Sequence, residues 1–310
     1  MNIVSLWDSA VSDWELERPF SKQQYNRDYE HYSKLAEEKD AKLFLAHYTW
    51  YKDGRMKKAF TYENGEWRKV NDIEVNGVWD AFKVNDETLE IKRRMEERHV
   101  IINRPNVDRL CKDKLETYER FSNLVPETRK ASETNIERMI EKYGEAVVKP
   151  RDDWGGEGVQ IVEDVSGFND DSEDWLVQEF VDASEGISKL GVEGVHDLRA
   201  LVVNGEAVTG FLRQPDEGFV SNVHQGGSIE VVELENFPSG ALNIVEQVKE
   251  EMSDLEPYLM TVDMIYDSET DEFRVLELNS KPGMSFYGRE DMKKAKSRVM
   301  ERIVESFKNA

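Results

Sequence analysis

Residue types that cross-link a chain or embed it in a membrane are nearly missing from this sequence. Cys111 is the only cysteine among 310 residues, which excludes an intrachain disulfide and a cysteine-rich zinc site. No apolar run approaches the roughly 18 residues that span a bilayer, and residues 1–8 lack the basic and apolar regions of a secretory signal. We therefore expect a cytoplasmic protein without a membrane partner.

Positive charge is also scarce, since 41 lysines and arginines stand against 64 aspartates and glutamates and give a formal net charge of −23. A field of this sign opposes non-specific attraction to nucleic acid, so nucleic acid is not an expected partner. The acidic residues are spread along the chain. This distribution is typical of a soluble acidic protein or of a surface adapted to high salt, and it also suits a cationic amine substrate.

No internal repeat or low-complexity tract divides the chain, so changes of periodicity set the expected boundaries. Residues 1–104 have the pattern of a mixed α/β domain. Its expected elements are strands at 2–6, 41–46, 78–82 and 100–103, a hairpin of 60–62 with 67–70 around Asn64-Gly65, and helices over 89–99 and around Tyr25, Tyr29, Tyr32 and Leu35.

After a break at residues 104–106 the pattern becomes α+β. One helix is expected over 106–121, with Asn106 as its N-cap. The capping box Thr134-x-x-Glu137 indicates the start of a second helix. Short strands of antiparallel sheet are expected at 147–149, 159–162, 176–181, 199–203 and 207–212, with further helices at 242–252 and 292–307.

Two apolar strands near the end of the chain carry oxygen-bearing side chains. Asp263 lies in the strand 260–265, and Glu277 and Asn279 lie in the strand 273–279. Side chains alternate along a strand, so Glu277 and Asn279 project to the same face. The short acidic turn between the strands folds them into a hairpin that brings the three side chains together. Two carboxylates and one amide oxygen favour Mg²⁺ or Mn²⁺ over zinc.

A glycine-rich stretch, Gly155-Gly156-Glu157-Gly158, lies between two expected strands and follows Lys149. A strand follows these glycines where a P-loop or a dinucleotide fingerprint would have a helix, so neither motif applies. A glycine hairpin between strands can instead fold over phosphates and offer them backbone N–H groups. The alternative is an ordinary β-turn without a ligand.

Polar groups also occur at the ends of other expected strands. The segment 176–182 suits a linker whose main chain pairs with adenine, and a plain edge strand is its alternative. Arg199 and Arg213 suit bidentate binding of a phosphate or a carboxylate, and surface salt bridges are their alternative. His224, in a loop with two glycines, is expected to form hydrogen bonds without a catalytic role.

The order of these features resembles the ATP-grasp superfamily over about residues 100–290. The order is a helix lysine, a strand lysine before a glycine hairpin, Gln-Glu-Phe-Val, Asp-Leu-Arg, an arginine before Ser-Asn-x-His-x-Gly-Gly, an aspartate, and Glu-x-Asn-x-x-Pro-Gly. Within the superfamily, the chain looks most like the ligases that add glutamate to a ribosomal protein or to amino-group carriers (RimK-like), and like glutathione-synthetase domains.

The resemblance implies roles for individual residues. Lys114 and Lys149 would bind the phosphates of ATP, and Lys149 and Arg213 would act in catalysis. The remaining implied positions are Gly155, Gly156, Gly158, Gln178, Glu179, Phe180 and Val181 for the nucleotide, Asp197 or its rival Glu185 for the ribose side, Arg199, Arg213 and Asn222 for the acyl substrate, and Asp263, Glu277 and Asn279 for the metal.

The resemblance also implies a division of the chain and a reaction. Residues 1–104 would form an N-terminal α/β domain, and two α+β subdomains, 105–182 and 183–310, would clamp the nucleotide. The implied activity is an ATP- and Mg²⁺-dependent carboxylate–amine ligase that forms an amide through an acyl phosphate. Its substrates would be a small-molecule carboxylate and an amine, and these include an amino acid and a peptide or protein acceptor. The enzyme would assemble as a homo-oligomer. The alternatives are a phosphotransferase and a non-catalytic nucleotide-binding scaffold.

Overall fold

The structure, a computed structural model, describes residues 1–152, 156–166, 168, 174–215, 228–284 and 292–309. Its contacts divide the chain into two compact units. Unit 1 contains Met1–Asp108, Leu255–Met260 and Ser280–Ala310, and unit 2 contains Arg109–Asp254 and Thr261–Asn279. The three-part division expected from the sequence stays a prediction, but its last segment is shared between the two units.

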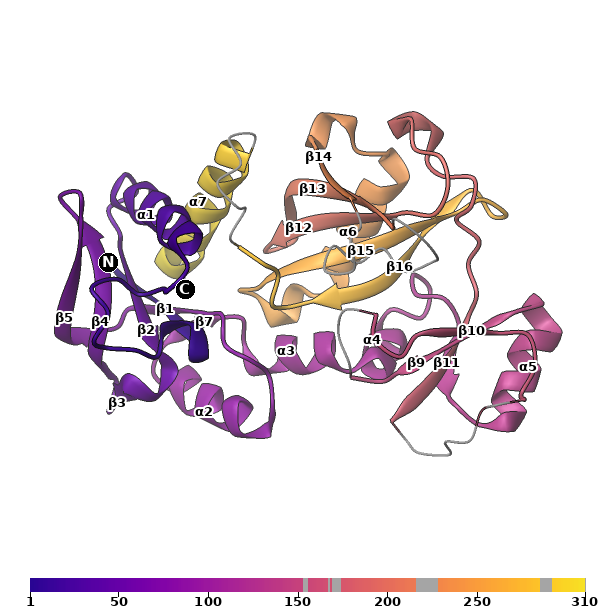
Figure 1. Ribbon diagram of the computed structural model, residues 1–310, viewed down its shortest axis with the longest axis horizontal. Coiled ribbons are helices and arrows are strands. Elements are labelled where there is room, and N and C mark those ends of the chain that lie inside the picture. The colour runs from indigo at the N-terminus through magenta and orange to yellow at the C-terminus, as the bar shows by residue number, and fades with distance from the viewer. Residues whose placement is uncertain (153–155, 167, 169–173, 216–227, 285–291, 310) are drawn as a thin grey trace. The chain divides into compact units, whose positions relative to one another are not determined.

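A seven-stranded sheet forms the centre of unit 1 (Figure 1). Its order is β3(Tyr51–Lys52), β4(Arg55–Glu63), β2(Lys42–His47), β1(Asn2–Trp7), β6(Gly77–Asp80) and β7(Val100–Ile102), while β5(Glu66–Glu74) pairs with β4. The neighbours β2, β1, β6 and β7 are parallel. Helices α1(Gln23–Glu37) and α2(Asp86–Glu96) connect β1 to β2 and β6 to β7. The α/β character expected of the first hundred residues is confirmed.

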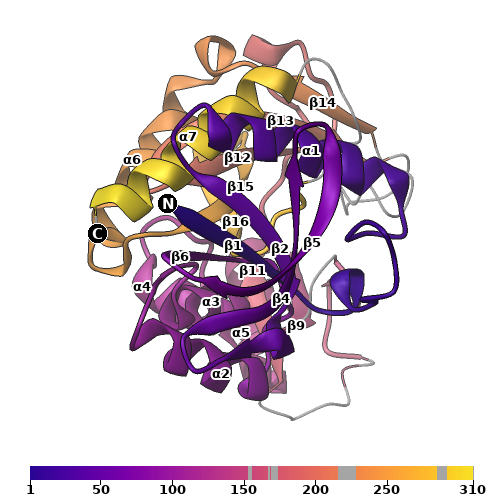
Figure 2. The same cartoon turned by 90° about the vertical axis from the view of Figure 1, so that its left-hand side faces the viewer.

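Helices cover both faces of this sheet. The last helix, α7(Lys293–Asn309), lies beside α1 although the two are far apart in the sequence (Figures 1 and 2). On the other face, Met95 of α2 packs in one cluster with Val4 of β1. Because both faces are covered, the four central residues of β1 are all buried. Gly77 of β6 leaves space for α7, since a Cβ built there would lie 2.5 Å from the ring of Phe307.

Two further sheets belong mainly to unit 2. The four-stranded sheet has the order β10(Gln160–Val162), β9(Ala146–Pro150), β11(Trp175–Glu179) and β8(Thr128–Lys130), with antiparallel pairings. The five-stranded sheet has the order β14(Ser228–Val232), β13(Glu206–Gln214), β12(Asp197–Val203), β15(Leu259–Asp267) and β16(Glu272–Asn279). Helix α5(Glu133–Tyr143) packs on the first sheet and α6(Ser239–Glu251) on the second. This is the α+β architecture expected from the sequence.

Shorter helical elements occur at Ser9–Val11, Tyr48–Trp50, Ser188–Leu190, Leu234–Asn236 and Ser253–Leu255. Helix α7 has 17 residues. Nowhere in the described ranges is there a helix with the length and apolar character needed to cross a membrane.

The single helix expected over 106–121 is wrong, because the chain forms two helices there, α3(Pro105–Lys112) and α4(Lys114–Arg120). Asp113 separates them. Its Oδ1 accepts hydrogen bonds from the N–H groups of Leu115 and Glu116 at 3.0 and 3.3 Å. A side chain that satisfies the first free N–H groups of a helix favours a helix start at that point. The expected N-cap, Asn106, lies inside α3 instead.

The capping box expected at Thr134-x-x-Glu137 is also wrong. Helix α5 begins after Ser132, whose hydroxyl oxygen accepts from the Asn135 N–H at 3.2 Å. The end of the same helix is predicted correctly, since Gly144 follows its last residue with φ of +83°. Glycine adopts this conformation at helix ends without steric cost.

Candidate active site

One face of the five-stranded sheet carries a row of charged side chains. Asp197 and Arg199 of β12 are two residues apart and therefore share a face. Arg213 of β13 is the direct partner of Asp197, and Glu277 of β16 is the direct partner of Asp263 of β15. Directly opposed residues of antiparallel strands project to the same side. The strand order β13, β12, β15, β16 places the five side chains in neighbouring positions.

Hydrogen-bonded ion pairs join four of these side chains into a ladder of alternating charge. Arg199 donates from Nε to Asp263 Oδ1 at 2.8 Å and from Nη2 to Asp263 Oδ2. Arg213 donates from Nη2 to Asp263 Oδ2 at 2.9 Å and from Nε to Asp197 Oδ1 at 2.7 Å. The four side chains are 3% to 20% exposed. Neither arginine therefore forms an exposed surface salt bridge, which was the alternative that the sequence left open.

The pKa values of the two aspartates in this ladder shift in opposite directions. Burial raises the pKa of Asp197 to about 7, against the attraction of Arg213. Burial alone would also raise the pKa of Asp263, but attraction to Arg199 and Arg213 outweighs it and lowers that pKa. Asp263 is therefore held as an anion. Glu185, the rival of Asp197 for the ribose side, is exposed to solvent.

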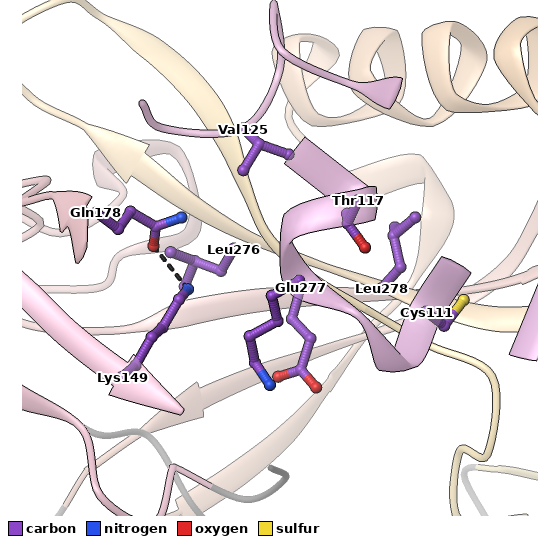
Figure 3. A pocket seen from close by; sticks show the side chains of 9 residues that line it. Cys111, Thr117, Val125, Lys149, Gln178, Leu276, Glu277 and Leu278 are labelled. Atoms are coloured by element: carbon purple, nitrogen blue, oxygen red, sulfur yellow. Dashed lines mark hydrogen bonds between the residues drawn. The ribbon is translucent and has the colours of Figure 1, made fainter. Parts of the chain in front are cut away.

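Glu277 lines a narrow pocket in unit 2 together with two lysines (Figure 3). The lining residues are Cys111, Lys114, Thr117, Val125, Lys149, Gln178, Leu276, Glu277 and Leu278. Burial and then the charge of Lys114 lower the pKa of Lys149 to about 8, against the attraction of Glu277. Burial and then the charge of Asp263 raise the pKa of Glu277. The lysine side of the pocket therefore favours an added anion, and the Glu277 side favours an added cation. Phosphates bound together with a metal ion would meet both requirements.

A chain of hydrogen bonds orients Lys149. Its Nζ donates to Gln178 Oε1 at 2.7 Å (Figure 3), and Gln178 Nε2 donates to Thr128 Oγ1 at 2.8 Å. Thr128 Oγ1 in turn donates to the carbonyl oxygen of Pro126 at 2.8 Å. Because the amide nitrogen is engaged by Thr128, the amide oxygen faces the lysine. The Gln178 side chain, expected from the sequence near adenine, thus contacts the candidate phosphate lysine.

The glycine-rich stretch connects β9 to β10, which are antiparallel neighbours. Gly156 and Gly158 lie in a turn with φ of +74° and +75°, a region in which glycine is not strained. Gly155 lies outside the described residues. At the root of the stretch, Arg151 donates from Nε and Nη2 to the two carboxylate oxygens of Asp113 at 2.8 and 2.6 Å. The carboxylate that caps α4 therefore also holds the start of the glycine turn.

The segment expected to meet adenine begins where β11 ends. The N–H of Glu179 donates to Glu127 O at 2.8 Å, and Glu179 Oε2 accepts from the Glu127 N–H at 2.9 Å. Phe180 is half-buried. Val181 is buried in a small apolar cluster with Ala183. The segment thus combines an anchored main chain with an apolar side chain, as a wall for a flat aromatic base requires.

The three expected metal ligands lie on the hairpin of β15 and β16. Asp263 is opposed to Glu277, and Asn279 is opposed to Thr261 at the next pair along the same face. Two carboxylates and an amide oxygen fit a hard divalent cation, and a cation would offset the burial and the charge of Asp263 that together raise the pKa of Glu277. Within the described ranges no three His, Cys, Asp or Glu side chains gather as a metal site, and the expected set includes the Asn279 amide beside the two carboxylates.

Asn222, expected in the acyl site, lies outside the described residues together with the rest of its glycine-containing loop. Lys114 is the first residue of α4, and its N–H donates to Arg151 O at 3.1 Å. The described part of the site thus includes both lysines, both arginines and the hairpin acids. All of them belong to unit 2.

Known proteins resemble this chain in sequence and in fold. A family model described as an ATP-grasp domain matches residues 111–285. The tetrahydromethanopterin:alpha-L-glutamate ligase of Methanocaldococcus jannaschii is 26% identical over 246 residues, which are 74% of this chain and 78% of that relative.

Solved structures show the same fold at low sequence identity. The ATP-grasp ligase PsnB, complexed with a minimal precursor, Mg and ADP, has a TM-score of 0.61 at 12% identity, with 98% of this chain and 97% of that chain covered. An ATP-grasp ligase associated with RiPP peptides from Chryseobacterium gregarium, in complex with ADP and a leader and core peptide, has a TM-score of 0.60 at 14% identity, with 100% and 98% covered.

Proposed function

Because the chain belongs to the ATP-grasp family, we propose that it is an ATP-dependent carboxylate–amine ligase that forms an amide bond and releases ADP and phosphate. One observation carries the proposal. Lys114, Lys149 and Glu277 line one pocket, and Glu277 is directly opposed to Asp263, which binds Arg213. This set supplies cations for phosphates, carboxylates for a metal and an arginine for a phosphoryl group, as phosphoryl transfer requires.

In the proposed complex, Lys114 and Lys149 bind the phosphates of ATP. The turn that contains Gly156 and Gly158 brings backbone N–H groups over them, with Gly155 in the same stretch. The main chain of residues 179–181 pairs with the edge of adenine. Support for this placement comes from the pocket lining and from the apolar burial of Val181, which provides a surface for the base.

Asp263, Glu277 and Asn279 would hold Mg²⁺ or Mn²⁺, and the bound ion would offset charge on the β- and γ-phosphates. Asp263 is suited to this role because its lowered pKa keeps it ionised. Its two bonded arginines keep its carboxylate in one orientation. The same carboxylate therefore links the metal side of the site to Arg213.

The proposed reaction has two steps. A substrate carboxylate oxygen attacks the γ-phosphorus, the bond to the ADP oxygen breaks, and an acyl phosphate forms while Lys149 and Arg213 stabilise charge on the phosphoryl oxygens. The amine nitrogen then attacks the acyl carbonyl carbon, loses a proton, and inorganic phosphate leaves. Arg199 and Asn222 would contact the acyl group. Placement and fixed charge supply the acceleration, so no covalent nucleophile of the enzyme is needed.

The proposed substrates are a small-molecule carboxylate and an amine, at least one of them an amino acid, with a peptide or protein as a further class of acceptor. The M. jannaschii relative is named a glutamate ligase, and the two solved ligases are complexed with a minimal precursor and with a leader and core peptide. These names support glutamate as the first amino acid to test. A homo-oligomer is part of the proposal on the ground of family resemblance alone.

The decisive experiment is ADP release by the purified chain with ATP, Mg²⁺ and a panel of amino acids and carboxylates, repeated with hydroxylamine. A ligase is expected to give a hydroxamate from the activated carboxylate, in amounts equal to the ADP released. A stable phosphoester would instead identify a phosphotransferase. ADP binding without turnover on the whole panel would identify a nucleotide-binding scaffold, and either result would overturn the proposal.

A further inference from the structure

Arg213 is held from two sides by carboxylates, and one of them has no role in the reaction described so far. Asp197 is the direct cross-strand partner of Arg213, and its Oδ1 accepts from Arg213 Nε at 2.7 Å. Asp263 Oδ2 accepts from Arg213 Nη2 at 2.9 Å. The two bonds engage neighbouring donors of the planar guanidinium fork, which leaves the group little rotational freedom.

The burial of Asp197 is hard to reconcile with a contact to a ribose hydroxyl. Its side chain is 7% exposed and that of Arg213 is 15% exposed. The family resemblance placed Asp197 or Glu185 on the ribose side, and Glu185 is the exposed one of the two. If Asp197 left Arg213 to bind a hydroxyl, the largely buried guanidinium would lose one of its two carboxylate partners. This loss would carry a substantial cost in free energy.

We infer that Asp197 is a positioning residue that aims Arg213 at the transferring phosphoryl group, rather than a ligand of the ribose. This inference rests on the proposed function for the role of Arg213. It has a physical consequence. Loss of Asp197 should weaken interactions that form as the phosphoryl group moves, and should leave the binding of the nucleoside and its two inner phosphates unchanged.

The test compares Asp197→Asn, Arg213→Lys and the double variant with the wild-type chain. Asparagine keeps the shape of the aspartate and removes its charge, and lysine keeps the charge of the arginine and removes its fork. Calorimetry with Mg²⁺ present measures the affinity for ADP, for ADP with aluminium fluoride as a mimic of the transferring group, and for ATP against 2′-deoxy-ATP. Steady-state ADP release gives kcat and KM.

Asp197→Asn is expected to bind ADP as wild type does and to keep the wild-type preference between ATP and 2′-deoxy-ATP. Its kcat and its affinity for ADP with aluminium fluoride should fall about tenfold, as is typical when a supporting partner of a functional group is removed. In the Arg213→Lys background, the Asp197 change should add little, because the guanidinium fork that Asp197 orients is already absent.

Three results would overturn the inference. The first is weaker ADP binding by Asp197→Asn, and the second is loss of its discrimination against 2′-deoxy-ATP. The third is a double variant in which the losses of kcat from the two single substitutions multiply. If Asp197→Asn does not fold, Asp197→Glu, which keeps the charge and displaces the guanidinium, is measured in the same way. The binding measurements need no acid or amine substrate, so a wild-type chain without turnover would reject the ligase while the role of Asp197 is still decided.

Discussion

Lys149 of β9 donates a hydrogen bond to the neutral side-chain oxygen of Gln178 on β11, at 2.7 Å, in a pocket where burial lowers the lysine pKa to about 8. A carboxylate at the position of the amide would pair with the lysine and compete with a phosphate. The amide orients the ammonium without neutralising it. The electrostatic attraction of Lys149 is thereby kept for an anionic ligand.

The affinity for ATP should fall as pH rises through about 8. Bound phosphate favours the charged lysine, so deprotonation of Lys149 opposes nucleotide binding. The free energy of unfolding of the nucleotide-free chain should change in the other direction, because the pKa of Lys149 in the folded chain, about 8, is below the usual lysine value. Between these two values the unfolded chain binds more protons, so the free energy of unfolding should rise with pH. Calorimetric titration and chemical denaturation across this range measure both effects.

Two variants control this prediction. Lys149→Met should bind ATP more weakly and with an affinity that no longer falls through about pH 8. Gln178→Glu should raise the pKa of Lys149, move the decline in ATP affinity to higher pH and weaken binding at neutral pH, since the new carboxylate competes with phosphate. An unchanged decline in Lys149→Met would show that another group is responsible.

Glu277→Gln and Asp263→Asn should both abolish ADP release but should differ in stability. Glu277→Gln replaces a carboxyl group whose pKa is raised by burial. Because the folded chain disfavours the charged form of this group, its removal should change the free energy of unfolding little. Asp263→Asn leaves two largely buried arginines, 20% and 15% exposed, without their shared anion, which should cost about 3 kcal/mol. Denaturant titrations of the two variants measure the difference, and equal losses of stability would contradict it.

Asp113→Ala should raise the KM for ATP about tenfold, because Asp113 holds the root of the glycine turn through Arg151 and caps the helix that begins at Lys114. The loss of the cap alone should destabilise the chain by about 1 kcal/mol. Asp152→Ala is a matched control, since the ion pair of Asp152 with Lys112 is 60% exposed at the aspartate, and it should change stability by less than about 1 kcal/mol. Equal effects of the two variants on KM would refute this role of Asp113.

Lys281→Met should destabilise unit 1 by about 3–5 kcal/mol. Lys281 and Lys92 each bind both Asp80 and Asp108, and all four side chains are 10% exposed or less. Removal of one lysine leaves two buried carboxylates with a single cation. Lys39→Met, which removes a lysine from an ion pair that is 39% exposed at the lysine, should leave the stability close to that of the wild-type chain. Thermal unfolding of both variants checks the contrast, and similar midpoints would contradict it.

Features that depend on near neighbours in the chain were predictable. The hairpin of β15 and β16 follows from two apolar runs around an acidic turn, and alternation along a strand places Glu277 and Asn279 on one face. The glycine at the end of α5 was predicted for the same reason, since Gly144 follows the last apolar turn of a periodic pattern. In each case the physical cause lies within a few residues.

Helix starts were harder, because several side chains compete for the same N–H groups. Asn106, Asp113, Ser132 and Thr134 are all good capping residues by type, and the sequence favoured the wrong member of each pair. For Asp113 the deciding partner is Arg151, 38 residues away. An acid directly before the candidate phosphate lysine was the available signal for a helix start there.

The amino-acid sequence by itself determined the kinds of elements, their order and the identity of the residues that suit ATP chemistry, because periodicity and motif spacing act along the chain. The tertiary structure decided the partner of each buried charge. Arg213 meets Asp197 and Asp263, which are 16 and 50 residues away, and Arg199 meets Asp263 across 64 residues. Sheet order and register select such pairs, since a buried ion requires the nearest opposite charge in space, whatever its distance in sequence.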